Sequence, residues 1–129
     1  MKKQEYLDRL EKLKLDKNRY CVISGGVLLV YGLKDTTSDI DIKIRPDYFE
    51  ELKSIINFKK SPKLEYDDLY EIDDDIEVAV RDYDDADVRM VDGCPVESLE
   101  LTMQWWIDHN RPKDQEKIQL VKDYLEANL

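Results

Sequence analysis

The chain has 129 residues, of which 42% are hydrophobic, and its formal net charge is −10 at pH 7. This length suits one domain with one modest core, expected over residues 1–129, and the ordinary apolar content argues against a disordered chain. The acidic balance disfavours a protein that binds DNA or RNA in bulk, because such proteins need a basic face for their phosphate contacts.

Other features of the sequence narrow the cellular setting. The segment Met1-Lys2-Lys3 leads directly into a charged helical pattern, so we expect no secretory signal peptide. No apolar run is long enough to span a bilayer, so no membrane partner is expected. The two cysteines, Cys21 and Cys94, lack the CxxC or Cys/His spacing of a zinc site. These features predict a cytoplasmic protein with free thiols.

The first third of the chain alternates between helical and strand patterns. Residues 2–15 carry apolar side chains at helical spacing, which predicts an amphipathic helix. Residues 20–23 form a short apolar run that is typical of a strand. The tight turn Ser24-Gly25-Gly26 follows, and residues 27–31 predict one or two helical turns that Gly32 ends.

An alternating strand is predicted next, at Asp39-Ile40-Asp41-Ile42. Because side chains at i and i+2 of a strand share a face, Asp39 and Asp41 point the same way, while Ile40, Ile42 and Ile44 point into a core. Two carboxylates on one face repel each other, and they are tolerated if water screens them or a divalent cation lies between them. This strand is therefore the first candidate for a functional site.

The middle of the chain predicts a helix and two strands. Pro46 suits the first turn of a helix, and apolar spacing continues that helix to residue 56. Residues 57–64 lack a clear period and are expected to be irregular, whereas residues 66–72 are compatible with a strand. Residues 76–80 predict a clear strand in which Glu77 shares a face with Ala79.

The last third predicts one short strand and two helices. Residues 82–87 form an acidic loop, and residues 88–91 a short strand before the turn signal Asp92-Gly93. Ser98 begins a helix to about residue 108, and Pro112 begins a last helix to about residue 127. The order of elements predicts an α/β (α+β) fold with a mixed sheet flanked by helices.

The first of these helices contains both tryptophans of the chain, Trp105 and Trp106. Adjacent residues on a helix cannot both face the core. We expect one indole in the core, while the other either only packs against the protein or also stacks on a base or covers a partner.

A strand, the turn Gly25-Gly26 and, about a dozen residues later, Asp39-Ile40-Asp41-Ile42 resemble the nucleotidyltransferase superfamily of the DNA polymerase β type. The chain looks most like its small single-domain bacterial members, such as aminoglycoside, lincosamide and toxin–antitoxin nucleotidyltransferases. That pattern includes a third acidic residue between hydrophobic residues on a later strand, and Ile76-Glu77-Val78 fits it. The segment Arg111-Pro112-Lys113-Asp114 is similar to an Arg-x-Lys-Asp segment of these relatives. The resemblance spans about residues 20–120.

The resemblance implies the small nucleotidyltransferase fold and the transfer of NMP from an NTP, with ATP as the expected donor, to an acceptor hydroxyl. Asp39, Asp41 and Glu77 would be the catalytic carboxylates and would hold two Mg²⁺ ions, with Glu77 also a candidate general base. Asp75 and Asp82 are alternatives for the third carboxylate, although neither is flanked by hydrophobic residues on both sides.

A second set of residues is expected to bind the nucleotide. A Gly-Gly turn lets backbone amides approach a phosphate, hydroxyl groups donate to it, and basic side chains balance its charge. The nucleotide-binding candidates are Ser24, Gly25, Gly26, Ser38, Arg111 and Lys113. Each also has a structural reading: a tight turn for the glycines, a cap for the hydroxyls, and a solvated helix start for the two cations. Relatives often carry a lysine in the preceding helix, where this chain has Gln104.

Three functions are compatible with these residues. The first is transfer of NMP to a small molecule such as a cationic antibiotic, for which an acidic surface is suitable. The second is transfer to a macromolecule, either tRNA or a protein; tRNA would require a local basic patch. Such a patch could be built from Lys53, Lys59, Lys60 and Lys63. The third is a catalytically degenerate nucleotide- or protein-binding domain, for example one half of a toxin–antitoxin pair. A helical protein partner, or a second copy completing the acceptor site, is compatible with these functions.

Overall fold

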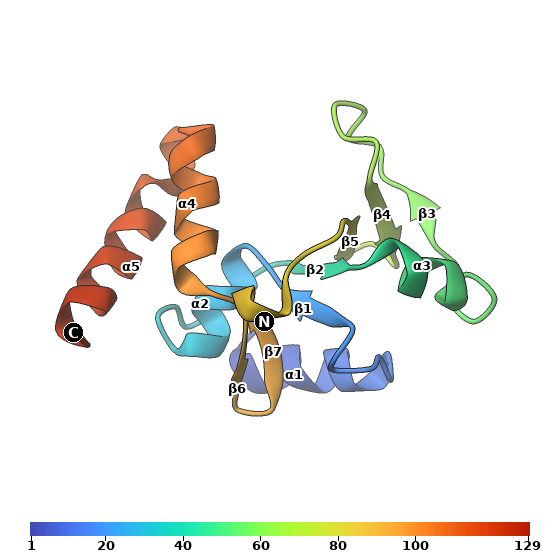
Figure 1. Ribbon diagram of the computed structural model, residues 1–129, viewed down its shortest axis with the longest axis horizontal. Coiled ribbons are helices and arrows are strands. Elements are labelled where there is room, and N and C mark those ends of the chain that lie inside the picture. The colour runs from blue at the N-terminus through green and yellow to red at the C-terminus, as the bar shows by residue number, and fades with distance from the viewer.

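The computed structural model describes residues 1–129 and has the mixed α+β architecture that the sequence predicts (Figure 1). The strands are β1 (Tyr20–Val22), β2 (Ile40–Ile44), β3 (Lys59–Lys60), β4 (Leu69–Ile72), β5 (Ile76–Val80), β6 (Val88–Val91) and β7 (Cys94–Glu97). The helices are α1 (Lys3–Lys12), α2 (Gly25–Tyr31), α3 (Pro46–Leu52), α4 (Leu99–His109) and α5 (Gln115–Ala127). Two short 3₁₀ helices lie at Asp85–Asp87 and Pro112–Asp114.

The seven strands form one sheet in the order β3-β4-β5-β2-β1-β7-β6. The pairs β2–β5 and β1–β7 are parallel and the other neighbours are antiparallel, so the sheet is mixed. Strand β2 therefore lies in the middle of the sheet. Its neighbours in the sheet are β5 on one side and β1 on the other.

Strand β2 has the predicted alternation. Ile40, Ile42 and Ile44 are at most 1% exposed and belong to the hydrophobic core, whereas Asp41 and Lys43 are partly exposed on the opposite face. Burial of three isoleucines on one face fixes the register of the strand, because a slip of one residue would move all three to the polar side. The sheet therefore has one core face and one polar face at β2.

The N-terminal helices complete the core. Helix α1 runs beneath the strands in Figure 1 and buries Tyr6 and Leu10. Helix α2 is buried over most of its length, and it ends at Gly32, whose left-handed backbone (φ +81°) is the predicted helix-ending conformation.

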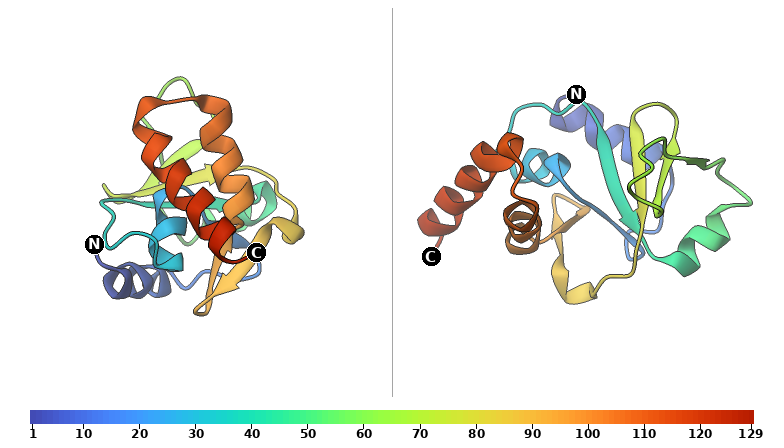
Figure 2. Two further views of the ribbon diagram at one scale, coloured as in Figure 1. Left: turned by 90° about the vertical axis from the view of Figure 1, so that its left-hand side faces the viewer. Right: turned by 90° about the horizontal axis from the view of Figure 1, so that it is seen from above.

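Helices α4 and α5 form an antiparallel hairpin on the other side of the molecule from α3 and the β3–β4 hairpin (Figures 1 and 2). The Ser98 side chain accepts a hydrogen bond from the Leu101 N–H and caps α4 as predicted. Trp106 is 1% exposed in the core, whereas Trp105 is partly exposed and its ring stacks on His109 at 3.6 Å. The expectation that only one indole is in the core is confirmed.

The third helix is shorter than predicted. The apolar spacing that begins at Pro46 continues to residue 56, but α3 ends at Leu52 and Ile55 is 80% exposed. The chain turns here, so that Phe58 packs against Phe49 with ring centroids 4.8 Å apart. A further helical turn would carry Phe58 away from this contact.

Strand β7 and the two-residue strand β3 were not predicted from the sequence. All four residues of β7 are buried, although the strand contains Pro95 and Glu97 and has no alternating pattern. It is a strand because it lies between β1 and β6 in the sheet, which is a tertiary constraint. None of the helices has both the length and the apolar character that crossing a membrane requires.

Candidate active site

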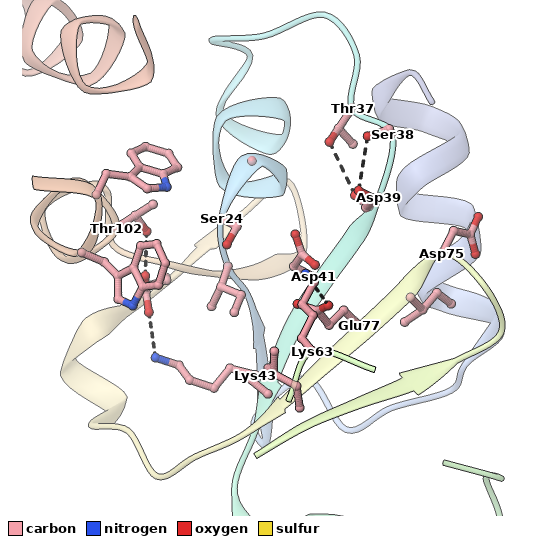
Figure 3. A pocket seen from close by; sticks show the side chains of 18 of the residues that line it. Ser24, Thr37, Ser38, Asp39, Asp41, Lys43, Lys63, Asp75, Glu77 and Thr102 are labelled. Carbon is pink, nitrogen blue, oxygen red and sulfur yellow. Dashed lines mark hydrogen bonds and ion pairs between the residues drawn. The ribbon is translucent and has the colours of Figure 1, made fainter. Parts of the chain in front are cut away.

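A cleft of about 700 Å³ lies over the polar face of β2 and β5, and the α4–α5 hairpin contributes its other wall (Figure 3). The predicted site residues that line it are Ser24, Gly25, Ser38, Asp39, Asp41, Glu77, Arg111 and Lys113. Gly26 does not line it. The structure therefore gathers residues that are nearly 90 positions apart in the sequence into one concave site, from Ser24 to Lys113.

Asp39, Asp41 and Glu77 form an acidic group on one face of the sheet, which we call the carboxylate trio (Figure 3). Asp41 pairs with Glu77 in the parallel β2–β5 register, so their side chains point to the same side. Asp39 directly precedes β2 and shares that side. The sheet register therefore brings together the three carboxylates that the sequence resemblance selected.

The carboxylate trio concentrates negative charge. Burial, together with repulsion from Glu77 and Asp39, raises the pKa of Asp41 to about 6. Lys63 and Lys117 act in the opposite direction. A carboxylate that resists ionisation in this way is stabilised by an added cation.

One lysine already contacts the trio. The ammonium of Lys63 lies 2.9 Å from Glu77 Oε2, and this hydrogen bond raises the pKa of Lys63. Lys63 is thus engaged at the cleft rather than free to build a basic patch with the other lysines. It provides one positive charge against three carboxylates.

The structure also separates Glu77 from its two alternatives. Asp75 accepts hydrogen bonds from both terminal nitrogens of Arg9, which hold its pKa below the ordinary value. It lies apart from the trio in Figure 3. The Asp82 side chain is 84% exposed and lies 3.4 Å from Arg45. Among Glu77, Asp75 and Asp82, only Glu77 lies directly opposite Asp41 in the pairing of β2 with β5.

The donor set of the trio fits a divalent cation such as Mg²⁺. Carboxylate oxygens are its preferred protein ligands, and the raised pKa of Asp41 indicates negative charge without a sufficient partner. In this arrangement no group of three or more histidine, cysteine, aspartate or glutamate side chains converges closely enough to hold a metal ion. Binding would therefore require side-chain rearrangement, including movement of Lys63 away from Glu77.

The two glycines of the turn have different roles. A Cβ on Gly25 would meet only Thr37 Oγ1, at 3.6 Å, so its backbone lies open to the cleft. A Cβ on Gly26 would lie 2.1 Å from the Tyr6 hydroxyl and 2.8 Å from Val22 Cγ1. Gly26 is therefore needed for the close packing of α2 on α1 and β1. These close contacts support the structural role, a tight turn, that the sequence left open for Gly26.

The two serines also differ. Ser38 Oγ lies 3.3 Å from Asp39 Oδ2, so it donates a hydrogen bond to a member of the trio. Ser24 makes no capping hydrogen bond, and its backbone has φ 60° and ψ −142°. Non-glycine residues rarely adopt positive φ, and such strain is often found at functional sites.

We expect Ser24→Gly to raise the free energy of unfolding by about 1 kcal/mol. Relief of strain worth about 1–3 kcal/mol outweighs the extra backbone entropy of glycine, about 0.5–1 kcal/mol. Urea denaturation of this variant and of Ser24→Ala, which keeps the strain and removes the hydroxyl, tests the expectation. Equal stability of the two variants would contradict it.

Sequence reasoning missed several polar side chains of the cleft. Lys43 Nζ lies 2.7 Å from Glu97 Oε2, and Thr102 Oγ1 donates to Glu97 Oε1 at 2.8 Å. The Lys43 and Glu97 side chains are only 12% and 10% exposed. Lys43 could have been found, because it lies two residues after Asp41 and so shares its face. Glu97 and Lys117 carry no such signal.

No model of a protein family matches the sequence, and a search of the curated proteins gives no match. Two solved structures are similar to this chain. A candidate nucleotidyltransferase from Thermotoga maritima is 24% identical with a TM-score of 0.63, and the match covers 98% of this chain and 96% of that chain. ANT(2″)-Ia in complex with adenylyl-2″-tobramycin is 20% identical with a TM-score of 0.55, covering 97% of this chain and 88% of that chain. The chain therefore has the small nucleotidyltransferase fold that the sequence resemblance implied.

Proposed function

We propose that the protein is a metal-dependent nucleotidyltransferase that moves NMP from an NTP, with ATP as the expected donor, to an acceptor hydroxyl. The observation that carries the proposal is the carboxylate trio, which lies in the cleft over β2 and β5 of a nucleotidyltransferase fold. The basic side chains of Arg111, Lys113 and Lys117 line the same cleft and suit a polyphosphate.

In the proposed reaction the acceptor oxygen attacks the α-phosphorus and pyrophosphate leaves. Asp39, Asp41 and Glu77 would hold two Mg²⁺ ions, which when bound lower the pKa of the acceptor hydroxyl and neutralise phosphate charge. Glu77 accepts the proton of that hydroxyl as general base once Lys63 has moved away from it. Asp39 is oriented by its hydrogen bond from Ser38.

The remaining candidates bind the donor. The first N–H groups of a helix have no partner within the helix, so the amide of Gly25 is available to a phosphate oxygen. Ser24 adds a hydroxyl at the same turn. Arg111 and Lys113 balance the charge of the departing pyrophosphate, where fixed donors stabilise the transition state most effectively.

We favour a small cationic acceptor. The ANT(2″)-Ia structure contains adenylyl-2″-tobramycin, and further carboxylates, Glu71 and Asp74, line the cleft of this chain. These charges would attract a polyamine-like molecule. A non-catalytic nucleotide-binding domain is the alternative, because Lys63 already neutralises part of the trio from within the protein.

Thermal unfolding with Mg²⁺ and each NTP in turn tests the proposal. A ligand that binds only the folded state should stabilise the protein by about 2.7 kcal/mol at a hundredfold excess over its Kd. The double variant Asp39→Asn/Asp41→Asn should lose the shift. The NTP that gives it is then used, with the label on its α-phosphate, to screen aminoglycosides for labelled product. Absence of a shift with every NTP would contradict the proposal.

A further inference from the structure

The α4–α5 hairpin presents three basic side chains to the cleft, opposite in charge to the carboxylate trio. They are Arg111, at the end of the connecting segment, Lys113 in the following 3₁₀ helix, and Lys117 in the first part of α5. The cleft thus has an acidic wall on the sheet and a basic wall on the hairpin.

A buried carboxylate holds two of these basic groups. Asp114 is 0% exposed, and it accepts hydrogen bonds from Arg111 Nε at 2.6 Å and Lys117 Nζ at 3.3 Å. Burial alone would raise the pKa of Asp114, but these two hydrogen bonds outweigh it and the pKa lies below the ordinary value. Asp114 is therefore ionised at neutral pH and fixes both cations.

Each cation is also held by an indole. The Arg111 guanidinium carbon lies 4.8 Å from the ring centroid of Trp105, and Lys117 Nζ lies 5.4 Å from that of Trp106. Long basic side chains lose rotamer entropy when they are fixed. Here much of that cost is met before a ligand arrives, so a polyphosphate would meet preorganised positive charge.

The charges of this group do not cancel. Arg111 and Lys117 with Asp114 carry a net charge of +1, and exposed Lys113 adds another positive charge to the same wall. A group that served only to fasten the helical hairpin would need no excess of positive charge toward the cleft. This excess of positive charge fits a triphosphate. Its metal-binding oxygens would face the carboxylate trio, and its other oxygens would face the α4–α5 hairpin.

We propose that Lys117 binds the polyphosphate of the donor and that Asp114 is a positioning residue, which holds Lys117 and Arg111 toward it. This inference rests on the proposed function. It gives a role to Asp114, which belongs to the Arg-x-Lys-Asp segment but was not a site candidate, and to Lys117, which lies outside that segment. Asp114 contacts no ligand and acts through the two cations.

The test compares a polyphosphate with a ligand that lacks one. Calorimetric titration with Mg²⁺-pyrophosphate, Mg²⁺-ATP and AMP is carried out on the wild-type protein and on Lys117→Gln. We expect the Kd for pyrophosphate and ATP to rise about tenfold or more, because a charge-assisted hydrogen bond is lost, whereas the Kd for AMP should change less than about twofold. Lys122→Gln, at an exposed position of the same helix, is the matched control and should bind all three ligands normally.

Asp114→Asn tests the positioning role. It should weaken pyrophosphate binding as Lys117→Gln does, and the double variant should be little worse than either single variant because the two residues act together. In steady-state assays Lys117→Gln should raise the KM for the NTP more than it lowers kcat. If Asp114→Asn does not fold, Lys117→Gln and its control still decide the assignment.

The outcomes separate this inference from the function on which it rests. Wild-type binding of pyrophosphate and ATP that is unchanged in Lys117→Gln would overturn the inference alone. If the wild-type protein binds neither ligand, both the inference and the proposed function are wrong. An equal loss of AMP binding in Lys117→Gln would also overturn it, since a polyphosphate contact cannot account for that loss.

Discussion

Replacing Asp41 with asparagine should abolish nucleotidyl transfer and at the same time stabilise the metal-free protein. Activity should fall by about a thousandfold or more, because a charged group that the proposed reaction requires is lost. The free energy of unfolding should rise because asparagine is uncharged. Burial and repulsion from Glu77 and Asp39 disfavour a charge at this position. A loss of activity from misfolding would instead lower the stability, so the two measurements together distinguish a catalytic role from a structural one.

The stability gain should depend on pH in a direction set by the raised pKa of Asp41. The pKa is about 6 in the folded protein and 3.8 is its ordinary value, so the folded state binds the proton more tightly than the unfolded state. While Asp41 is protonated in both the folded and the unfolded state, it does not lower the free energy of unfolding. Above about pH 6 it is ionised in both states, and the full loss of stability is present. The cost is therefore of order 3 kcal/mol at neutral pH and disappears as the pH falls toward 4.

Urea denaturation of Asp41→Asn and wild type between pH 4.5 and 8, without divalent cations, measures this difference. It should grow up to about pH 6 and then remain constant. Glu126→Gln, an exposed substitution on the last turn of α5, should give no such pH-dependent difference. Added Mg²⁺ should stabilise the wild-type protein and not Asp41→Asn. A stability difference that does not change with pH would show that the pKa of Asp41 is not raised in the folded protein.

Replacing Gly26 with alanine should destabilise the protein by about 3 kcal/mol. The added methyl group would overlap the Tyr6 hydroxyl at 2.1 Å and Val22 Cγ1 at 2.8 Å, and overpacking of a buried site is costly. Tyr6 and Val22 are each 0% exposed in the core, so neither side chain can move into solvent. Urea denaturation at neutral pH gives the free energy of unfolding.

The neighbouring glycine provides the control. Gly25→Ala places its methyl group at an ordinary 3.6 Å from Thr37 Oγ1, and alanine favours the helix, so its stability should be equal to wild type or slightly higher. Tyr6→Phe should partly rescue Gly26→Ala. It removes the nearest clashing atom, and that hydroxyl is buried without a hydrogen-bond partner. Equal stability of the two alanine variants would rule out the packing role of Gly26.

These two predictions concern adjacent parts of one structure. The packing of α2 on α1 through Gly26 fixes the turn at Ser24 and Gly25, which lines the cleft. Ser24 lies beside Asp41 on the sheet side of the cleft (Figure 3). A variant that loosens the packing should therefore also impair nucleotide binding. A substitution in the trio that impairs nucleotide binding need not loosen this packing, because the trio lies on the polar face of the sheet and not in the core.

The features that depend on local backbone geometry could be predicted from the sequence alone. A strand repeats every two residues, so the alternation of residues 39–42 already placed Asp39 and Asp41 on one face and the isoleucines on the other. The helix end at Gly32 and the cap at Ser98 follow from the conformational preferences of single residues. The two acidic residues and the turn before them were therefore identified without any knowledge of the tertiary structure.

Which distant side chains meet at the site depends instead on the packing of the whole chain. The sequence preferred Glu77 over Asp75 because hydrophobic residues flank it. The parallel register of β2 and β5 then places Glu77 opposite Asp41, and an ion pair with Arg9 occupies Asp75. The helical hairpin brings Lys117 into the cleft in the same way. Such contacts join residues that are far apart in the chain, and no local periodicity encodes strand register or the packing of one helix on another. These long-range contacts are fixed by burial of the common core, which depends on the whole fold at once.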